Sequence, residues 1–155
     1  MSSVYTRYES ERIMTNERDI LASCACHRVR TAARAVTRAY DDALRPVGLR
    51  ATQLIVLVAT AADDALSITA LAKLMGMDRS TLTRNLRPLE AEGLIAMGAE
   101  GWRRSRTLEI TKKGRARLRE AVPLWEKAQQ ALQDRLGERR WDVIRRDLDD
   151  LVRAA

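Results

Sequence analysis

The fold is decided by residues 71–95, which read Leu71-Ala-Lys-Leu-Met-Gly-Met-Asp-Arg-Ser-Thr-Leu-Thr-Arg-Asn-Leu-Arg-Pro-Leu-Glu-Ala-Glu-Gly-Leu-Ile95. Gly76 is a suitable end for a first short helix, and Asp78 is a suitable N-cap for a second, predicted from about residue 79 to residue 92. Leucines recur in this second helix at i, i+4 and i+7 and form one apolar face, Leu82, Leu86 and Leu89. The spacing predicts a helix-turn-helix whose second helix buries one face and leaves the other free.

The free face of the second helix carries hydroxyl and guanidinium groups. At 100° per residue, Ser80, Arg84 and Arg87 lie opposite the leucines, and Thr81 and Thr83 lie on the flanks. Arginine can hold guanine through two hydrogen bonds, hydroxyls bond to bases or phosphates, and a helix fits the major groove. We therefore predict a DNA-binding set on this helix, namely Arg79, Ser80, Thr81, Thr83, Arg84 and Arg87.

A hairpin with a basic tip is predicted directly after this helix. Residues 94–97 and 106–110 are typical of two short strands, and the segment between them reads Gly98-Ala-Glu-Gly-Trp-Arg-Arg-Ser-Arg106. Three arginines on a glycine-flanked loop suit insertion into a minor groove, where the negative potential is concentrated. A solvated turn with incidental charge is the alternative, and we favour DNA contact by Arg103, Arg104 and Arg106.

The positive charge of the chain is concentrated around these two elements. Between residues 79 and 117 there are ten basic and four acidic residues, whereas the whole chain has a net charge of +7. Nearly the entire excess therefore lies in about a quarter of the sequence, as expected for a protein that binds a polyanion. A solvated basic face would give the same count, so charge alone does not decide between the two interpretations.

Helices are predicted on both sides of this lobe. In chain order we expect a flexible arm (1–17), one long helix (18–45), a buried apolar helix (52–62), an extended piece (Ser67 and Ile68), a short helix capped by Thr69 (70–75), a long helix capped by Thr111 and ended by Gly137, and a last helix that carries Trp141 and Val152.

This order predicts a mainly α fold, a winged helix-turn-helix with N- and C-terminal dimerisation helices. A single regulator domain would span 18–155, with dimerisation helices at about 18–45 and 111–154 and a DNA-binding lobe at about 52–110. The outer helices carry apolar stripes, and nothing in the domain is large enough to cover them. A partner subunit is the simplest cover, so we expect a homodimer.

Two motifs resemble a known family. Residues 71–95 resemble the reading unit of the multiple-antibiotic-resistance regulator (MarR) family, and Arg103-Arg-Ser-Arg-Thr-Leu-Glu-Ile-Thr-Lys-Lys-Gly114 resembles its wing and the helix that follows. The resemblance covers about residues 22–136. It implies a triangular homodimer on a pseudopalindromic operator, usually a repressor released by a small ligand or by cysteine oxidation. The chain departs from the family pattern at Trp102, where the family usually has Asp; we expect Trp102 to pack at the base of the wing.

The resemblance offers a redox route for signal sensing. In the spacing of Cys26, Thr37 and Tyr40 the chain is similar to the organic-hydroperoxide regulators of this family, whose oxidation sensor is a cysteine near the start of the first helix. Oxidation would place a bulky polar group in the dimer region. The opposing interpretation puts Cys26 on a buried face with Val29 and Ala33, as an inert small hydrophobe. The basic neighbours that would favour its thiolate are His27, Arg28 and Arg30.

The other route is a small-molecule inducer. It would be an aromatic or phenolic acid bound between the dimer helices and the reading domain, with its carboxylate held by an arginine such as Arg28, Arg34 or Arg38. The sequence leaves both routes open. Metal binding by Cys24, Cys26 and His27 is less favoured, because side chains at consecutive helical positions diverge and a fourth ligand is lacking.

Several function classes are disfavoured by the same sequence. The longest mostly apolar run, 54–62, is shorter than the ~20 residues of a membrane span, and no signal-peptide pattern precedes it, so we expect a cytoplasmic protein. Cys24 and Cys26 are poorly placed for a disulfide within one helix. The single histidine, His27, and the lack of a catalytic constellation argue against an enzyme, and we expect no cofactor. A nonspecific architectural DNA-binding protein is the remaining alternative.

Overall fold

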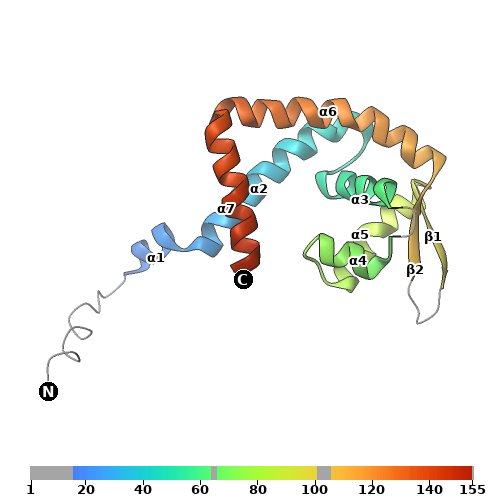
Figure 1. Cartoon of the computed structure of the whole chain (residues 1–155), viewed down its shortest axis with the longest axis horizontal. Coiled ribbons are helices and arrows are strands. Elements are labelled where there is room, and N and C mark those ends of the chain that lie inside the picture. Colours follow the sequence, from blue (N-terminus) through green and yellow to red (C-terminus); the bar gives the residue numbers. More distant parts are fainter. Residues whose placement is uncertain (1–15, 64–65, 101–105, 155) are drawn as a thin grey trace, which may run out of the picture. The chain divides into compact units, whose positions relative to one another are not determined.

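The computed structural model describes residues 16–63, 66–100 and 106–154 (Figure 1). Its elements in chain order are α1 (Glu17–Ser23), α2 (Ala25–Leu44), the 3-10 helix η2 (Arg45–Val47), α3 (Ala51–Ala62), α4 (Ile68–Leu74), α5 (Arg79–Ala91), β1 (Ile95–Glu100), β2 (Arg106–Ile110), α6 (Lys112–Leu136) and α7 (Glu138–Ala154). The chain divides into two compact units, the first ending at Val36 and the second beginning at Thr37.

The first unit contains a helix break that the sequence did not reveal. One continuous helix over 18–45 was predicted, and this is wrong at Cys24, whose extended backbone (ψ 109°) ends α1 before α2 begins at Ala25. A break exposes carbonyl groups that have lost their helical partners. The Arg28 guanidinium meets this need, because its Nε and Nη2 atoms donate to the Ala22 carbonyl at 2.9 and 2.6 Å.

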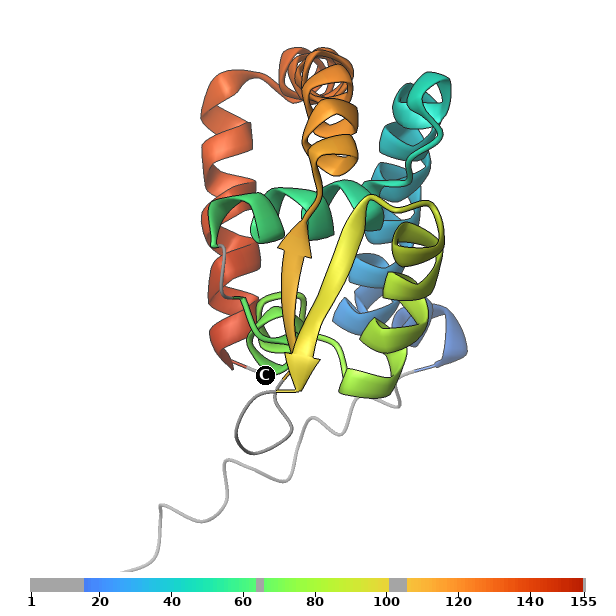
Figure 2. The ribbon, with the colours of Figure 1, turned by 90° about the vertical axis from the view of Figure 1, so that its right-hand side faces the viewer.

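The second unit is built on a leucine-rich core beneath α5. Helices α3 and α4 pack on β2, and α5 packs on β1 (Figure 2). The predicted apolar face of α5 is fully buried there, with Leu82, Leu86 and Leu89 all 0% exposed. Helix α3 is buried on one side only: Val56 and Leu57 are 0% exposed, but Ile55 and Val58 are 45% and 43% exposed. The predicted burial of this apolar helix is therefore confirmed for one side and wrong for the other within the described chain.

The two strands form an antiparallel hairpin with an irregular outer end. Ile95 pairs with Ile110 and Met97 with Leu108, but Glu100 pairs with Arg106, so β1 carries one extra residue between the last two pairs. Such a bulge lets a strand bend. Gly98 lies within it, and a Cβ atom there would lie 2.4 Å from the Thr107 hydroxyl oxygen, so a side chain does not fit.

A short bridge joins this hairpin to α4. Ser67 pairs with Thr107, so the predicted extended piece is confirmed at Ser67, whereas Ile68 already belongs to α4. The Ser67 hydroxyl accepts a hydrogen bond from the Ala70 amide at 3.1 Å and caps α4. The prediction that Thr69 caps this helix is therefore wrong, because the helix begins one residue before Thr69.

Helix α6 starts against the end of α5 and runs to α7 (Figure 1). Thr111 caps it as predicted, accepting from the Gly114 amide at 2.9 Å, and Gly137 ends it with a positive φ of 78°. Gly114 is buried, and a Cβ atom there would lie 2.0 Å from the Leu94 carbonyl oxygen. Within the described residues, no single helix is long and apolar enough to cross a membrane; α2 with η2 and α3 meet that test only as a bent pair.

Candidate nucleic-acid interface

The reading helix α5 begins at a cap that engages three donors. Asp78 accepts the Thr81 amide at 2.8 Å, the Ser80 hydroxyl at 2.5 Å and the Thr81 hydroxyl at 2.7 Å. The Ser80 hydroxyl first, then the hydroxyl and amide of Thr81, hold the pKa of the Asp78 carboxyl well below its usual range. Asp78 is therefore ionised and its negative charge lies at the N-terminal end of the helix, where the macrodipole favours it.

The hydroxyl groups of the predicted DNA-binding set already donate hydrogen bonds within the protein. Ser80 and Thr81 donate to Asp78, and Thr83 donates to the Arg79 carbonyl at 2.7 Å. A hydroxyl has one proton and two acceptor lone pairs. In this arrangement the three hydroxyls can only accept hydrogen bonds from a bound base, for example from the amino groups of adenine or cytosine.

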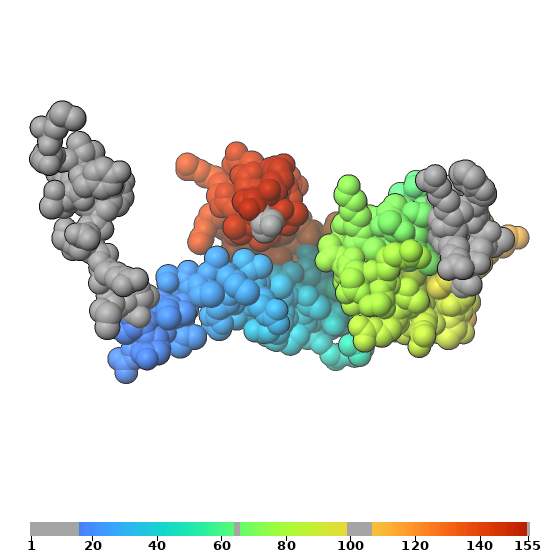
Figure 3. All heavy atoms as spheres, turned by 90° about the horizontal axis from the view of Figure 1, so that it is seen from below, coloured from blue at the N-terminus to red at the C-terminus, as the bar shows by residue number. Residues whose placement is uncertain are grey.

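The arginines of α5 supply the free donors. Ser80, Arg84 and Arg87 are exposed, while Thr81 and Thr83 are partly buried, as the helical geometry predicted; Arg79, in the first turn, is also exposed. Among the described residues, Arg79 and Arg87 have no ion pair or side-chain hydrogen bond assigned, and Arg84 makes one long contact, 3.3 Å from its Nη2 to the Thr81 hydroxyl. Figure 3, which shows the molecule from below, displays the outer side of α4 and α5 in green and yellow-green.

Asn85 is a residue of this helix that the sequence reasoning missed. It is partly buried, and its Nδ2 atom contacts the Met77 sulfur at 3.6 Å, which ties α5 back to the turn before it. The helical period could have identified Asn85, because it lies one turn after Thr81 on the same flank of the helix. Together with Arg84, Asp41 and Arg50 it also lines a hollow of about 480 Å³ between α2, α3 and α5.

The wing half of the predicted interface is only partly described. Arg103, Arg104 and Trp102 lie outside the described residues, and of Arg106 the structure gives only the backbone, at the start of β2 opposite Glu100. The described parts of β1 and β2 lead away from the C-terminal end of α5, with Leu94 bonded through its amide to the Leu89 carbonyl at 2.8 Å. Strand β1 therefore joins the C-terminal end of α5 to the segment that was predicted as the tip of the wing.

The predicted sensor residues lie in the first unit. Cys26 is exposed and Cys24 is partly buried, and both are free thiols. Val29 and Ala33 are also exposed, so the face they share with Cys26 is not buried within the described chain. Among the residues that the structure describes, no group of three His, Cys, Asp or Glu side chains is placed to hold a metal ion.

Comparisons with known proteins agree with this geometry. The MarR family model matches residues 47–101, which contain the helix-turn-helix and the first strand of the hairpin, β1. The transcriptional regulator MosR of M. tuberculosis is 39% identical, with 86% of this chain and 96% of that chain covered and a TM-score of 0.77. This chain belongs to the MarR family. The predicted family and the predicted winged helix-turn-helix are thus confirmed, and the protein is a DNA-binding transcription regulator.

Two further MarR-type structures show what such chains bind. MosR in complex with DNA is 40% identical over 84% of this chain and 95% of that chain, with a TM-score of 0.78. The transcriptional repressor CouR bound to p-coumaroyl-CoA is 25% identical over 86% of this chain and 95% of that chain, with a TM-score of 0.78. No curated protein sequence gives a significant match.

Proposed function

We propose that this MarR-family regulator is a homodimeric cytoplasmic repressor that reads one operator half-site with α5 of each subunit and grips the flanking minor groove with its wing. The observation that carries this proposal is the division of α5 into two faces. Three leucines of this helix are fully buried, Arg84 and Arg87 are exposed on the opposite side, and Arg79 is exposed in the first turn. The buried face fixes the helix in the lobe, so the exposed face is held ready for a major groove.

The outer helices supply the second half of the proposal. Large apolar side chains stay exposed on α1, α2 and α7 within the described chain: Ile20, Leu21, Val29, Val36, Val143, Leu148, Leu151 and Val152. Helices that leave this much apolar surface uncovered are typical of a subunit interface. A twofold dimer would present two copies of α5 to half-sites about one helical turn of DNA apart.

The proposal is tested by selecting duplexes from a random pool with the wild-type protein. A specific regulator should enrich one pseudopalindromic sequence and bind it at least about a thousandfold more tightly than random duplex at physiological salt. The architectural alternative predicts equal affinity for selected and random duplexes, and that result would overturn the repressor proposal. Transcription from a promoter that carries the selected sequence then separates repression from activation.

We further propose that a small acid releases the regulator through the hollow between α2, α3 and α5. Arg50 and Arg84 both line this hollow, so a bound carboxylate would draw Arg84 away from the DNA-reading face. Of the arginines considered from the sequence, Arg28 already donates to the Ala22 carbonyl. Titration of the protein–DNA complex with p-coumaroyl-CoA and with p-coumarate tests the idea. An acid that binds with Arg50→Ala as well as with wild type does not use the hollow.

Oxidation of Cys26 is the second candidate signal, because Cys26 shares a face of α2 with Val29 and an oxidised side chain there would disturb the proposed subunit interface. A hydroperoxide would transfer one oxygen atom to the thiolate, which gives a sulfenate and the corresponding alcohol. DNA binding should then fall after treatment with cumene hydroperoxide, and Cys26→Ser should abolish this response while Cys24→Ser retains it. A response that survives in Cys26→Ser assigns the sensor elsewhere.

A further inference from the structure

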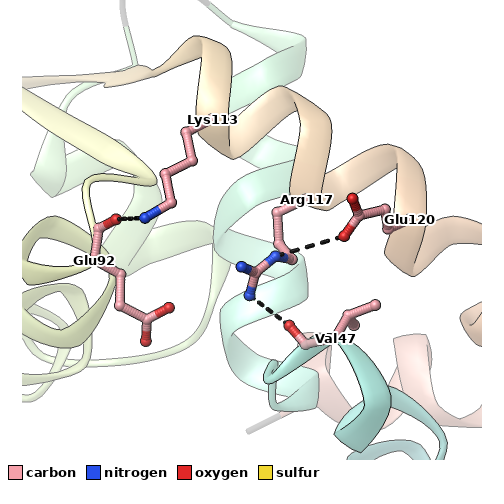
Figure 4. A network of polar contacts seen from close by, with 5 residues as sticks. All are labelled: Val47, Glu92, Lys113, Arg117 and Glu120. Atoms are coloured by element: carbon pink, nitrogen blue, oxygen red, sulfur yellow. Dashed lines mark hydrogen bonds and ion pairs between the residues drawn. The ribbon is translucent and has the colours of Figure 1, made fainter.

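Two cationic side chains on α6 bind main-chain carbonyls at the ends of two other helical elements. Lys113 donates through Nζ to the Glu92 carbonyl at 2.7 Å, and Arg117 donates through Nη1 to the Val47 carbonyl at 2.6 Å (Figure 4). They are four residues apart, so both project from the same side of α6, one turn from each other. Glu92 is the C-cap of the reading helix α5, and Val47 ends η2.

Both carbonyls lie at the C-terminal ends of helical elements, where carbonyl groups need a hydrogen-bond donor from elsewhere. The last carbonyls of a helix have no partner within it, and a positive charge there is favoured by the helix dipole. The Arg117 side chain is only 27% exposed, and its Nε atom lies 3.7 Å from the Glu120 carboxylate, which directs the guanidinium. Gly48 after Val47 has a left-handed backbone (φ 68°), and a Cβ atom there would lie in ordinary contact with the Arg117 Nη1 atom, at 3.5 Å.

A second set of contacts lies beside the first. The Thr111 hydroxyl donates to the Gly93 carbonyl at 2.7 Å, and the Thr111 amide donates to the Leu94 carbonyl at 3.1 Å. These bonds fix the start of α6 to the residues that follow α5, so the start of α6 would act as a pivot if α5 moved. The Lys113 bond lies beside that pivot, and the Arg117 bond lies one turn further along α6 and reaches η2. The residues that flank η2, Leu44 and Leu49, share one core with the leucines of α5. Rotation of α5 together with this core about the start of α6 would therefore break the Arg117 bond.

We propose that Lys113 and Arg117 are positioning residues that set the angle between the reading helix and α6, and through it the half-site spacing that the dimer accepts. This inference rests on the proposed function, in which two copies of α5 meet one face of a duplex. Neither residue needs to touch DNA for this role. In a twofold dimer a change of angle moves both reading helices, so the spacing of the preferred half-sites changes with it.

The test compares two double variants that lose the same charge. Lys113→Met with Arg117→Met removes both donors and keeps the apolar stems, whereas Lys112→Met with Arg119→Met removes two exposed cations with no bond assigned to them in the described chain. Each protein is used to select duplexes from a random pool. Affinity is then measured for the selected duplex and for derivatives with one base pair inserted or deleted between the half-sites.

Wild type and the control variant should enrich a single spacing and bind the altered duplexes about tenfold or more weakly. The Lys113/Arg117 variant should enrich several spacings and discriminate between them by about threefold or less, with the dimer intact. A variant with Lys113→Arg alone keeps a donor at position 113, so it should retain most of the wild-type discrimination. A variant that keeps the wild-type preference for one spacing overturns the inference, as does an equal loss on every duplex with a shallower salt dependence, which would indicate direct phosphate contacts.

Single variants keep the test decisive should the double variant fold poorly. Arg117→Met and Lys113→Met are each expected to widen the accepted spacing partially, and unchanged spacing in both overturns the inference. A wild-type protein that enriches no sequence would instead contradict the proposed function itself. The two failures are therefore distinguishable.

Discussion

The reading lobe and the outer helices use the same kinds of side chain in opposite ways. In the lobe, the leucines of α5 are 0% exposed and belong to one core with residues of α3, α4 and the hairpin. On α7, Leu148 and Leu151 are 48% and 46% exposed although they recur at the same helical spacing. The lobe thus completes its core within one chain, whereas the outer helices leave their apolar faces exposed within the described chain, as the proposed dimer requires.

The largest expected effect is a loss of stability from a change in the core of the lobe. Leu86→Ala removes a fully buried side chain from the centre of the α5 face and should lower the free energy of unfolding by about 3 kcal/mol, because a cavity remains. Urea unfolding at fixed protein concentration measures the change. Leu74→Ala is the control, since Leu74 is 66% exposed and should cost less than about 0.5 kcal/mol.

The second prediction concerns the outer helices: a charge on α7 should disrupt the dimer and leave the lobe folded. Leu151→Asp places a charge on the exposed apolar face of α7, so the dimer dissociation constant should rise about a hundredfold or more. Sedimentation velocity at several concentrations measures it. Arg146→Ser changes the charge by one unit on the opposite face of α7 and should leave the dimer unchanged. Equal dissociation in both variants would mean that α7 does not supply the interface.

The third prediction concerns the exposed face of α5, which belongs neither to the core of the lobe nor to the apolar faces of the outer helices. Arg84→Ala should weaken binding to the selected duplex about tenfold to a hundredfold without changing stability, because Arg84 is exposed. Fluorescence anisotropy at several salt concentrations measures both affinity and mechanism. A slope reduced by about one indicates a lost phosphate contact, and an unchanged slope indicates a lost base contact. Arg119→Ala is the matched control, and an Arg84 variant that binds like it would remove Arg84 from the interface.

The smallest effect is expected at the cap of α5. Hydrogen bonds lower the pKa of Asp78 in the folded protein, so the cap stabilises the fold fully above the ordinary carboxyl pKa of about 3.8. This contribution is lost as the pH falls through the lower folded value. Asp78→Ala should therefore reduce Tm slightly at pH 7, and its difference from wild type should shrink as the pH falls below about 4. A difference that stays constant down to acid unfolding would contradict the cap assignment.

Local spacing predicted the reading unit well. The buried leucines, the Asp78 cap, the exposed arginines and the Thr111 cap all follow from the helical period and from capping chemistry, which act within a few residues. The break at Cys24 was not predicted, because the segment has no glycine or proline there and the sequence does not show that the Arg28 side chain bonds to the Ala22 carbonyl. The Lys113 and Arg117 bonds also join residues 21 and 70 positions apart, beyond any local pattern.

The hydroxyls of α5 show a different limit. Their outward position followed from the period, but the direction of their hydrogen bonds depends on which acceptors lie nearby in three dimensions. Asp78 and the Arg79 carbonyl take all three protons, and this converts Ser80, Thr81 and Thr83 into acceptors. Composition alone had left them free to do either.

Gly114 carries a consequence for the evolution of this regulator. Even a methyl group at this position would overlap the Leu94 carbonyl, 2.0 Å from the place a Cβ would take, so the first turn of α6 has to retreat before any other residue is accepted. Both subunits would retreat at once, and each would carry its reading helix with it. Substitution at this one buried position would thus shift both reading helices of the proposed dimer, in addition to lowering stability.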